Sequence, residues 1–112
     1  MALRREGVMG RSLGNVVLSV ETFEMDGEKA AALKPLEEAA EVYGAWQLYD
    51  KAVKRGEVGL DGYKLELMDE VADCIQACCN LASRLRAVDR SCDIGLAMKR
   101  CHERNAARGR CS

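Results

Sequence analysis

The 112-residue sequence contains few prolines, histidines and aromatic residues: it has one Pro and one His, and Phe, Trp and Tyr together make up 4%. β-branched residues are also sparse, whereas Leu, Ala, Glu, Lys and Arg dominate, and this composition favours long helices over a sheet. The sequence therefore predicts an all-α fold. A chain of this length forms one small domain with a modest core, which excludes a large self-sufficient enzyme.

The sequence also lacks a strong net charge and a long apolar run. Seventeen basic and 18 acidic residues give a formal charge of -1, so any preference for a charged partner must come from a local patch. No apolar run approaches the roughly 18 to 20 residues that cross a bilayer. Gly7, Gly10 and Arg11 interrupt the amino-terminal segment, and no cleavage pattern of small residues follows. We expect a cytoplasmic protein that does not contact membranes.

The six cysteines include no Cys-x2-Cys pair. Cys74, Cys78 and Cys79 fall within one strongly helical stretch, where Cys behaves as a small hydrophobic residue, so reduced thiols are favoured over a disulfide scaffold or a zinc site. His102, the only histidine, lies in a basic helical segment, where we expect an exposed side chain.

The order of the elements is predicted from periodicity and capping residues. Residues 1–32 form a poorly defined segment, and a helical domain covers residues 33–112. The first helix begins near Leu33, with Pro35 in its first turn, and runs to about Lys54. The apolar positions of this helix follow steps of three and four; they are Ala39, Val42, Trp46, Tyr49 and Val53.

A second helix is expected over residues 61 to 87, with Asp61 as its cap. Its broad apolar stripe consists of Met68, Val71, Ile75, Cys78, Ala82 and Leu85, flanked by Leu67, Cys74 and Leu81. Asp93 is expected to cap a third helix, which Gly109 ends. Because two long helices and one or two shorter ones cannot bury so wide a stripe alone, we expect a helical bundle completed by self-association into a dimer or tetramer.

The first two predicted helices each carry two carboxylates three residues apart. These pairs, which share a helix face, are Glu38 with Glu41 and Glu70 with Asp73. Four carboxylates across a helix pair would repel one another unless a hard cation such as Mg²⁺ or Mn²⁺ lay between them. Each pair alone is more typical of a solvated face, since Asp73 lies roughly 160° from the middle of the apolar stripe and Glu70 roughly 90°.

The carboxyl-terminal part of the chain is basic. Residues 84 to 110 have a local net charge of +5 and include Lys99, Asn105 and Arg108, which can bind phosphate oxygens. Carboxylates that hold a cation, together with basic groups that hold phosphate, are the two parts of a metal-assisted phosphate site. A basic helix alone is more often a solvated helix end, and less often a nucleic-acid patch.

The ordered pattern Glu37-Glu38-x2-Glu41, 28 residues, Glu70-x2-Asp73, then Lys99-x5-Asn105-x2-Arg108 resembles the MazG-like branch of the all-α nucleoside triphosphate pyrophosphohydrolases. The resemblance covers about residues 33 to 109. It implies a dimeric or tetrameric helical bundle that hydrolyses nucleoside triphosphates to monophosphate and pyrophosphate with Mg²⁺.

The resemblance also implies roles for individual residues. The metal ligands would be Glu38, Glu41, Glu70 and Asp73. Glu37 would be an outer group or general base beside Glu38, and Lys99, Asn105 and Arg108 would contact the phosphates or the sugar. Trp46 has two interpretations: it packs in the core, or its ring stacks on the base.

The sequence thus predicts a Mg²⁺-dependent nucleotide pyrophosphohydrolase that clears unwanted nucleotides. The alternative is a non-enzymatic helical module that binds nucleic acid or a protein through its basic carboxyl-terminal helix.

Overall fold

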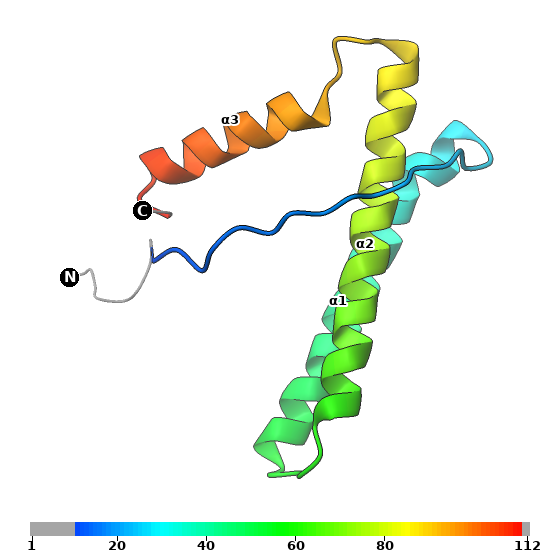
Figure 1. The fold of residues 1–112 in the computed structure, drawn as a ribbon. Coiled ribbons are helices and arrows are strands. Elements are labelled where there is room, and N and C mark those ends of the chain that lie inside the picture. The colour runs from blue at the N-terminus through cyan, green and yellow to red at the C-terminus, as the bar shows by residue number, and fades with distance from the viewer. Residues whose placement is uncertain (1–10, 111–112) are drawn as a thin grey trace. The chain divides into compact units, whose positions relative to one another are not determined.

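The computed structural model describes residues 11–110, and its regular elements are three helices, α1 (Glu28–Lys54), α2 (Asp61–Val88) and α3 (Ile94–Ala107) (Figure 1). The described residues contain no strand, which confirms the all-α prediction. The predictions that involve Gly7 and Gly10 lie outside these residues. None of the three helices is long and apolar enough to span a membrane.

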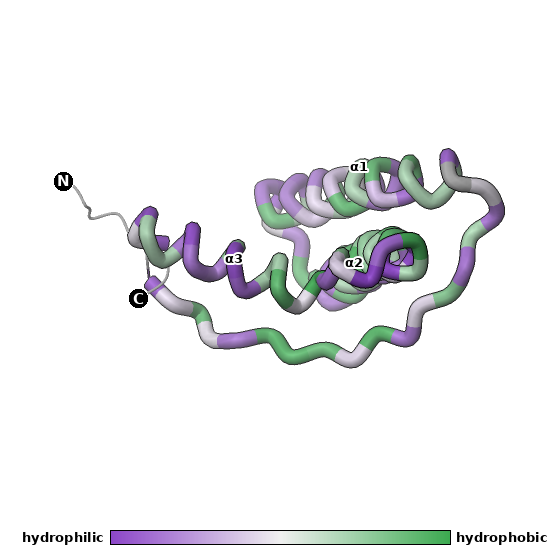
Figure 2. Tube along the Cα trace, turned by 90° about the horizontal axis from the view of Figure 1, so that it is seen from above, coloured by the Kyte–Doolittle hydropathy of each residue, from purple (hydrophilic) through white to green (hydrophobic). Residues whose placement is uncertain are grey.

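The chain divides into two units. Residues 20–89 form one unit, which contains α1 and α2, and α3 belongs to the other. Within the first unit, α1 and α2 run antiparallel and side by side as a helical hairpin (Figures 1 and 2). In the second unit, α3 begins with mainly apolar residues, and hydrophilic residues predominate from Lys99 to Asn105.

Small side chains form the contact between α1 and α2. On α1 the buried positions recur every seven residues; they are Ala31, Glu38, Ala45 and Ala52. On α2 one set of buried and half-buried positions alternates in steps of four and three; it consists of Tyr63, Leu67, Glu70, Cys74, Ala77, Leu81 and Arg84. We call this contact the seam. Its seven-residue repeat is that of coiled-coil packing, and its buried apolar side chains are all alanines.

The centres of the predicted apolar stripes are therefore rotated away from the seam, by about 70° on α1 and about 100° on α2 at 100° per residue, although Val42, Tyr49, Val71, Ile75 and Ala82 of these stripes are half-buried. Trp46 is 45% exposed and Met68 64% exposed, whereas Leu67 and Leu81, predicted to flank the stripe, lie in the seam. Because the helices are antiparallel, both rotations bring the stripes to the same side of the hairpin. We call this side the apolar face.

The helix ends agree with the predictions in part. α1 begins at Glu28, five residues before the predicted start at Leu33, so Pro35 lies inside the helix instead of in its first turn. The prediction of Asp61 as a cap is wrong, because Leu60 holds the N-cap position and Asp61 is the first helical residue. The Asp93 cap is confirmed: its Oδ1 accepts a hydrogen bond from Leu96 N at 3.1 Å.

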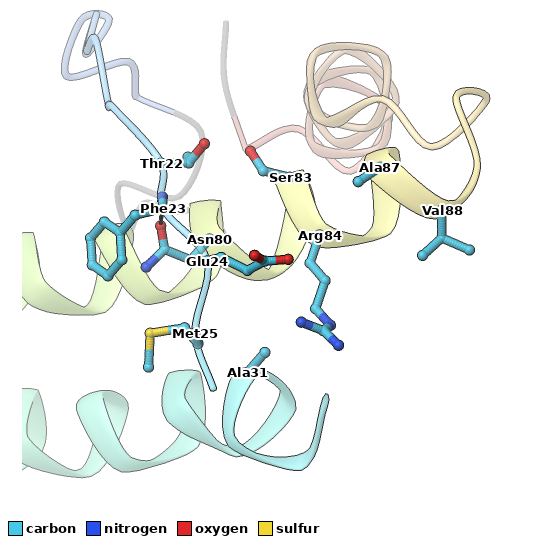
Figure 3. A pocket seen from close by; sticks show the side chains of 10 residues that line it. All are labelled: Thr22, Phe23, Glu24, Met25, Ala31, Asn80, Ser83, Arg84, Ala87 and Val88. Atoms are coloured by element: carbon cyan, nitrogen blue, oxygen red, sulfur yellow. Dashed lines mark hydrogen bonds between the residues drawn. The ribbon is translucent and has the colours of Figure 1, made fainter. Parts of the chain in front are cut away.

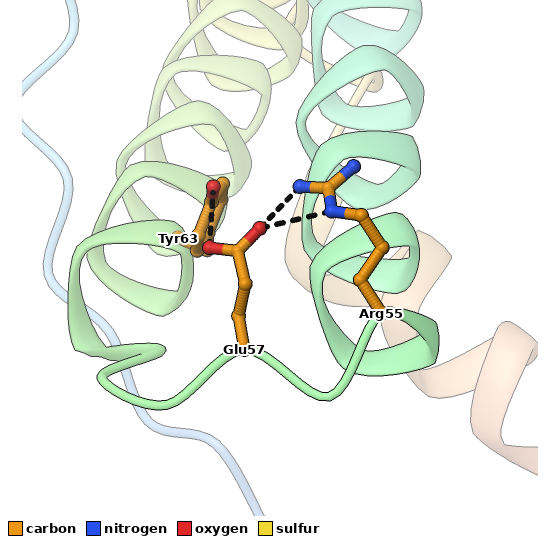
Figure 4. A network of polar contacts seen from close by, with 3 residues as sticks. All are labelled: Arg55, Glu57 and Tyr63. Carbon is orange, nitrogen blue, oxygen red and sulfur yellow. Dashed lines mark hydrogen bonds and ion pairs between the residues drawn. The ribbon is translucent and has the colours of Figure 1, made fainter.

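A short connection joins α1 to α2. Gly56 and Gly59 have φ angles of 70° and 74°, a region that glycine enters without steric cost. The carboxylate of Glu57 pairs with the Arg55 guanidinium and accepts a hydrogen bond from Tyr63 Oη at 3.1 Å, so it links both ends of the connection (Figure 4).

Residues 20–25, which we call the strap, run in an extended conformation against α2. Gln76 Nε2 donates to the carbonyl oxygen of Glu21 at 2.9 Å and to Asn80 Oδ1 at 3.0 Å, and Phe23 N donates to Asn80 Oδ1 at 3.1 Å. Asn80 is only 4% exposed. Two amide side chains of α2 thus hold the strap, a role that the sequence alone does not indicate.

Candidate metal centre

Three carboxylates meet across the seam. Glu38 and Glu41 lie one turn apart on α1, Glu70 lies on α2, and one oxygen of each is within 4.8 Å of the other two. Glu38 and Glu70 occupy seam positions, so the same seven-residue repeat that pairs the helices places these groups opposite each other. Glu41 is exposed at the edge of the seam. We call these three residues the carboxylate cluster.

The burial of Glu38 makes the cluster unusual. This residue is 7% exposed, and a buried carboxylate is costly unless it is paired. Lys34, one turn earlier on α1, supplies a partner: its Nζ lies 3.3 Å from Glu38 Oε2 and 3.6 Å from Glu37 Oε1. These contacts raise the pKa of Lys34, mainly through its hydrogen bond with Glu38.

The proximity of like charges also changes the titration of Glu70. Partial burial raises the pKa of Glu70 above its ordinary value, and the negative charges of Glu41 and Asp73 raise it further. A hydrogen bond with Glu41 and the charge of Glu38 act in the same direction. Glu70 therefore retains a proton more readily than an isolated glutamate would, as expected where burial and neighbouring negative charges disfavour the carboxylate.

Asp73, the fourth predicted ligand, is not part of the cluster. Its side chain is exposed, although its charge is near enough to raise the pKa of Glu70. At 100° per residue, Asp73 and Glu41 lie on the same side of the hairpin, opposite the apolar face. The structure thus brings together three of the four predicted ligands and places the fourth beside them.

The donor set of the cluster fits a hard divalent cation. All three donors are carboxylate oxygens, which Mg²⁺ and Mn²⁺ prefer, whereas softer metals favour thiolate or imidazole. A cation at this position would compensate the charge of Glu38 in the seam and lower the repulsion that acts on Glu70. Three protein ligands also leave coordination positions for water or phosphate oxygens.

Two further residues predicted on the first helix lie near the cluster in sequence but outside it. Glu37 is exposed and pairs with Lys34. Trp46 lies eight residues after Glu38, about 12 Å along the helix axis. Its ring packs against that of Tyr49, with 5.6 Å between the ring centroids. The Trp46 side chain thus packs against Tyr49 and is still 45% exposed.

The three residues predicted to bind phosphate lie on α3 or at its end. Lys99 and Arg108 are exposed, and Asn105 is half-buried, with its Nδ2 3.6 Å from Cys101 Sγ. His102 is exposed, as expected. Because α3 belongs to the other unit, the approach of these side chains to the carboxylate cluster stays a prediction.

A cavity of about 330 Å³ lies elsewhere in the hairpin unit, between the strap and the carboxyl-terminal half of α2 (Figure 3). Thr22 and Glu24 point to one side of the extended strap, and Phe23 and Met25 point to the other. The cavity begins at Asn80, ten residues after Glu70 and thus about 15 Å along α2, so it is separate from the cluster.

Sequence reasoning missed Lys34. The spacing does indicate this contact, because a lysine and a glutamate four residues apart on a helix commonly pair.

No family model matches this chain, and neither a curated protein nor a solved structure matches it.

Proposed function

We propose that this protein is a Mg²⁺-dependent nucleoside triphosphate pyrophosphohydrolase, with Mn²⁺ as a substitute metal. The observation that carries the proposal is the convergence of Glu38, Glu41 and Glu70 at the seam. Burying a carboxylate between packed helices lowers the stability of the fold, and such groups are found mainly where they serve a functional site. The ordered acidic and basic pattern that resembles the MazG-like family supports the same activity.

The proposed reaction is hydrolysis between the α and β phosphates by water. It requires neutralisation of negative charge on the phosphate oxygens and a water positioned in line with the leaving group. When bound, Mg²⁺ neutralises part of this charge and makes a coordinated water easier to deprotonate. Glu38, Glu41 and Glu70 would hold the ion, and Asp73 would complete the set after a change of rotamer.

The remaining residues would orient the substrate. Lys99, Asn105 and Arg108 would bind phosphate or sugar oxygens, and Trp46 would stack on the base. We further propose that the protein acts in the cytoplasm as a dimer or tetramer. No protein nucleophile is needed, because water attacks the phosphorus directly.

Pyrophosphate release from a panel of nucleoside triphosphates tests the proposal. With Mg²⁺, we expect turnover of at least one triphosphate to monophosphate and pyrophosphate. Replacing Glu41 or Glu70 with Gln should reduce the rate about 100-fold, because each change removes a charge that stabilises the transition state through the ion. The matched control is Glu66→Gln, an exposed glutamate one turn before Glu70, which should keep the wild-type rate.

Undiminished turnover in the Glu41 and Glu70 variants would refute the assignment. Absence of turnover would favour the alternative function if nucleic acid bound with a steep salt dependence. The observation that favours this alternative is an exposed basic stripe, formed by Arg100 and Arg104 of α3 and by Arg108 at its carboxyl-terminal cap.

A further inference from the structure

Lys34 is the cationic neighbour of the carboxylate cluster, and its ammonium group has two partners that differ in burial. The Glu38 side chain, 3.3 Å away, is 9% exposed, whereas the Glu37 side chain, 3.6 Å away, is 60% exposed. The three residues occupy one turn of α1, so a small change of the flexible lysine side chain exchanges one partner for the other.

We propose that Lys34 is a tethered counter-cation that neutralises Glu38 in the metal-free protein, is displaced from Glu38 when a divalent cation binds, and then stays paired with Glu37. This inference rests on the proposed metal site. It assigns Lys34 a positioning role that the sequence pattern does not contain. It also gives Glu37 a specific function, which is to hold the lysine away from the metal ligands.

The first argument for this role is the cost of leaving Glu38 unpaired. Removing one partner of a buried ion pair exposes the other to the full penalty of burial. The metal-free hairpin therefore needs a positive charge beside Glu38, and Lys34 supplies it. A divalent cation on the same carboxylate makes this charge unnecessary and repels it.

The second argument concerns the position of Glu37. An anionic partner that does not bind the metal would hold the displaced ammonium group away from it. Glu37 is exposed, lies one residue away from Glu38, and is already within 3.6 Å of Nζ. The energetic coupling between Lys34 and Glu37 should therefore change the affinity for the metal. A Glu37 that acts only as a metal ligand or general base would affect binding or turnover whether or not Lys34 is present.

A double-mutant cycle separates these possibilities. Titration calorimetry with Mg²⁺ or Mn²⁺ alone would measure the metal affinity of wild type, Lys34→Gln, Glu37→Gln and the double variant. We expect Lys34→Gln to bind the ion roughly fivefold more tightly, because one competing charge is removed. Glu37→Gln should bind a few-fold more weakly, and the double variant should match Lys34→Gln.

Thermal unfolding provides a second readout. Lys34→Gln should lower the melting temperature in the presence of a chelator and leave it unchanged with saturating Mg²⁺, because Lys34 stabilises Glu38 only while the metal is absent. Lys54→Gln is the matched control: Lys54 pairs with Asp50 at 2.8 Å, four residues apart, at the other end of α1. It should cause the same change with and without metal and leave the metal affinity unaltered.

Each outcome of these measurements decides between named alternatives. If wild type binds neither ion, the proposed metal centre itself is wrong. If wild type binds metal but Lys34→Gln behaves like Lys54→Gln, the metal centre stands and the counter-cation role is refuted. If Glu37→Gln weakens binding equally with and without Lys34, Glu37 acts directly on the metal and the proposed exchange is wrong.

Discussion

Two acidic residues occupy positions in the α1–α2 seam where the repeat otherwise places alanine or another packing residue. Glu38 follows Ala31 by seven residues and precedes Ala45 by seven, and Glu70 precedes Ala77 by seven. An apolar residue at either position would pack the helices at lower cost. Such local conflicts between sequence and fold tend to mark functional sites. The burial of Glu38 is therefore stronger support for a metal site than the presence of three neighbouring carboxylates.

Glu57 illustrates a residue whose charge stabilises the fold instead. Its hydrogen bond with the Arg55 guanidinium, helped by that from Tyr63, lowers the pKa of Glu57 below its ordinary value of 4.5. Because the pKa of Glu57 is lower in the folded than in the unfolded state, its ionised carboxylate stabilises the fold above pH 4.5. This stabilisation is lost as pH falls through the folded-state pKa.

Replacing Glu57 with Gln should therefore lower the free energy of unfolding at pH 7. The difference from wild type should shrink below pH 4.5. Urea denaturation followed by circular dichroism at several pH values measures this, with a chelator present to keep the carboxylate cluster metal-free. Tyr63→Phe, which removes one hydroxyl and no charge, is the comparison variant and should show a smaller change. A Glu57→Gln deficit that is constant with pH would contradict this account.

At the residue scale, spacing alone identified most of the candidate site. The steps Glu38-x2-Glu41 and Glu70-x2-Asp73 were sufficient to place pairs of carboxylates on single helix faces. Spacing could not show which pair member faces the other helix, because that depends on the rotation of each helix about its axis. The large apolar side chains suggested one rotation, and the small seam residues produced another.

At the scale of the helices, Pro35 is the clearest conflict between local sequence and structure. It is the eighth residue of α1, so it cannot donate the hydrogen bond that would satisfy the Ala31 carbonyl, and its ring crowds that group. For this reason the sequence predicts a helix start near Leu33, with Pro35 in the first turn. Tertiary packing of Ala31 against the seam extends the helix in the amino-terminal direction despite the proline.

Pro35→Ala should consequently stabilise the protein by about 1 to 3 kcal/mol, since proline is about 3 kcal/mol less favourable than alanine inside a helix and its rigidity in the unfolded chain offsets part of this. Urea denaturation and the helical signal at 222 nm would measure the effect. A loss of stability would show that the packing of the half-buried Pro35 ring outweighs the missing hydrogen bond. Leu36→Ala, at an exposed neighbouring position, controls for general changes in helix propensity.

The element boundaries were predictable where local chemistry determines them. Asp93 begins α3 because its carboxylate accepts the Leu96 N–H, and Gly109, with a φ of 71°, follows its end. The strap was not predictable, because Gln76 and Asn80 read as ordinary polar residues of a helix. Their role depends on contacts with residues more than 50 positions away.

For the hairpin unit as a whole, the two sides differ in character. The apolar face carries Trp46 and Met68, whereas Glu41 and Asp73 lie on the opposite side, where the carboxylate cluster meets solvent. Four alanines provide the buried apolar core, and no large side chain is fully buried among the described residues. At about 25 cal/mol per Å² of apolar surface, such a core contributes little stability for helices of this length.

The apolar face therefore leads to a prediction about assembly. Covering it with a second copy would bury the side chains that the hairpin leaves exposed, as the sequence predicted from the width of the second stripe. We expect wild type to sediment as a dimer or tetramer at about 10 µM, within the range of stable interfaces.

Ile75→Glu, at the centre of the α2 stripe, should shift the protein to monomer and lower its melting temperature, because a charge cannot be buried there unpaired. Leu48→Glu changes a similarly sized exposed residue on the opposite side of α1 and should leave the assembly intact. A wild-type protein that is monomeric at this concentration, and as stable as Ile75→Glu, would mean that the four-alanine seam alone maintains the hairpin.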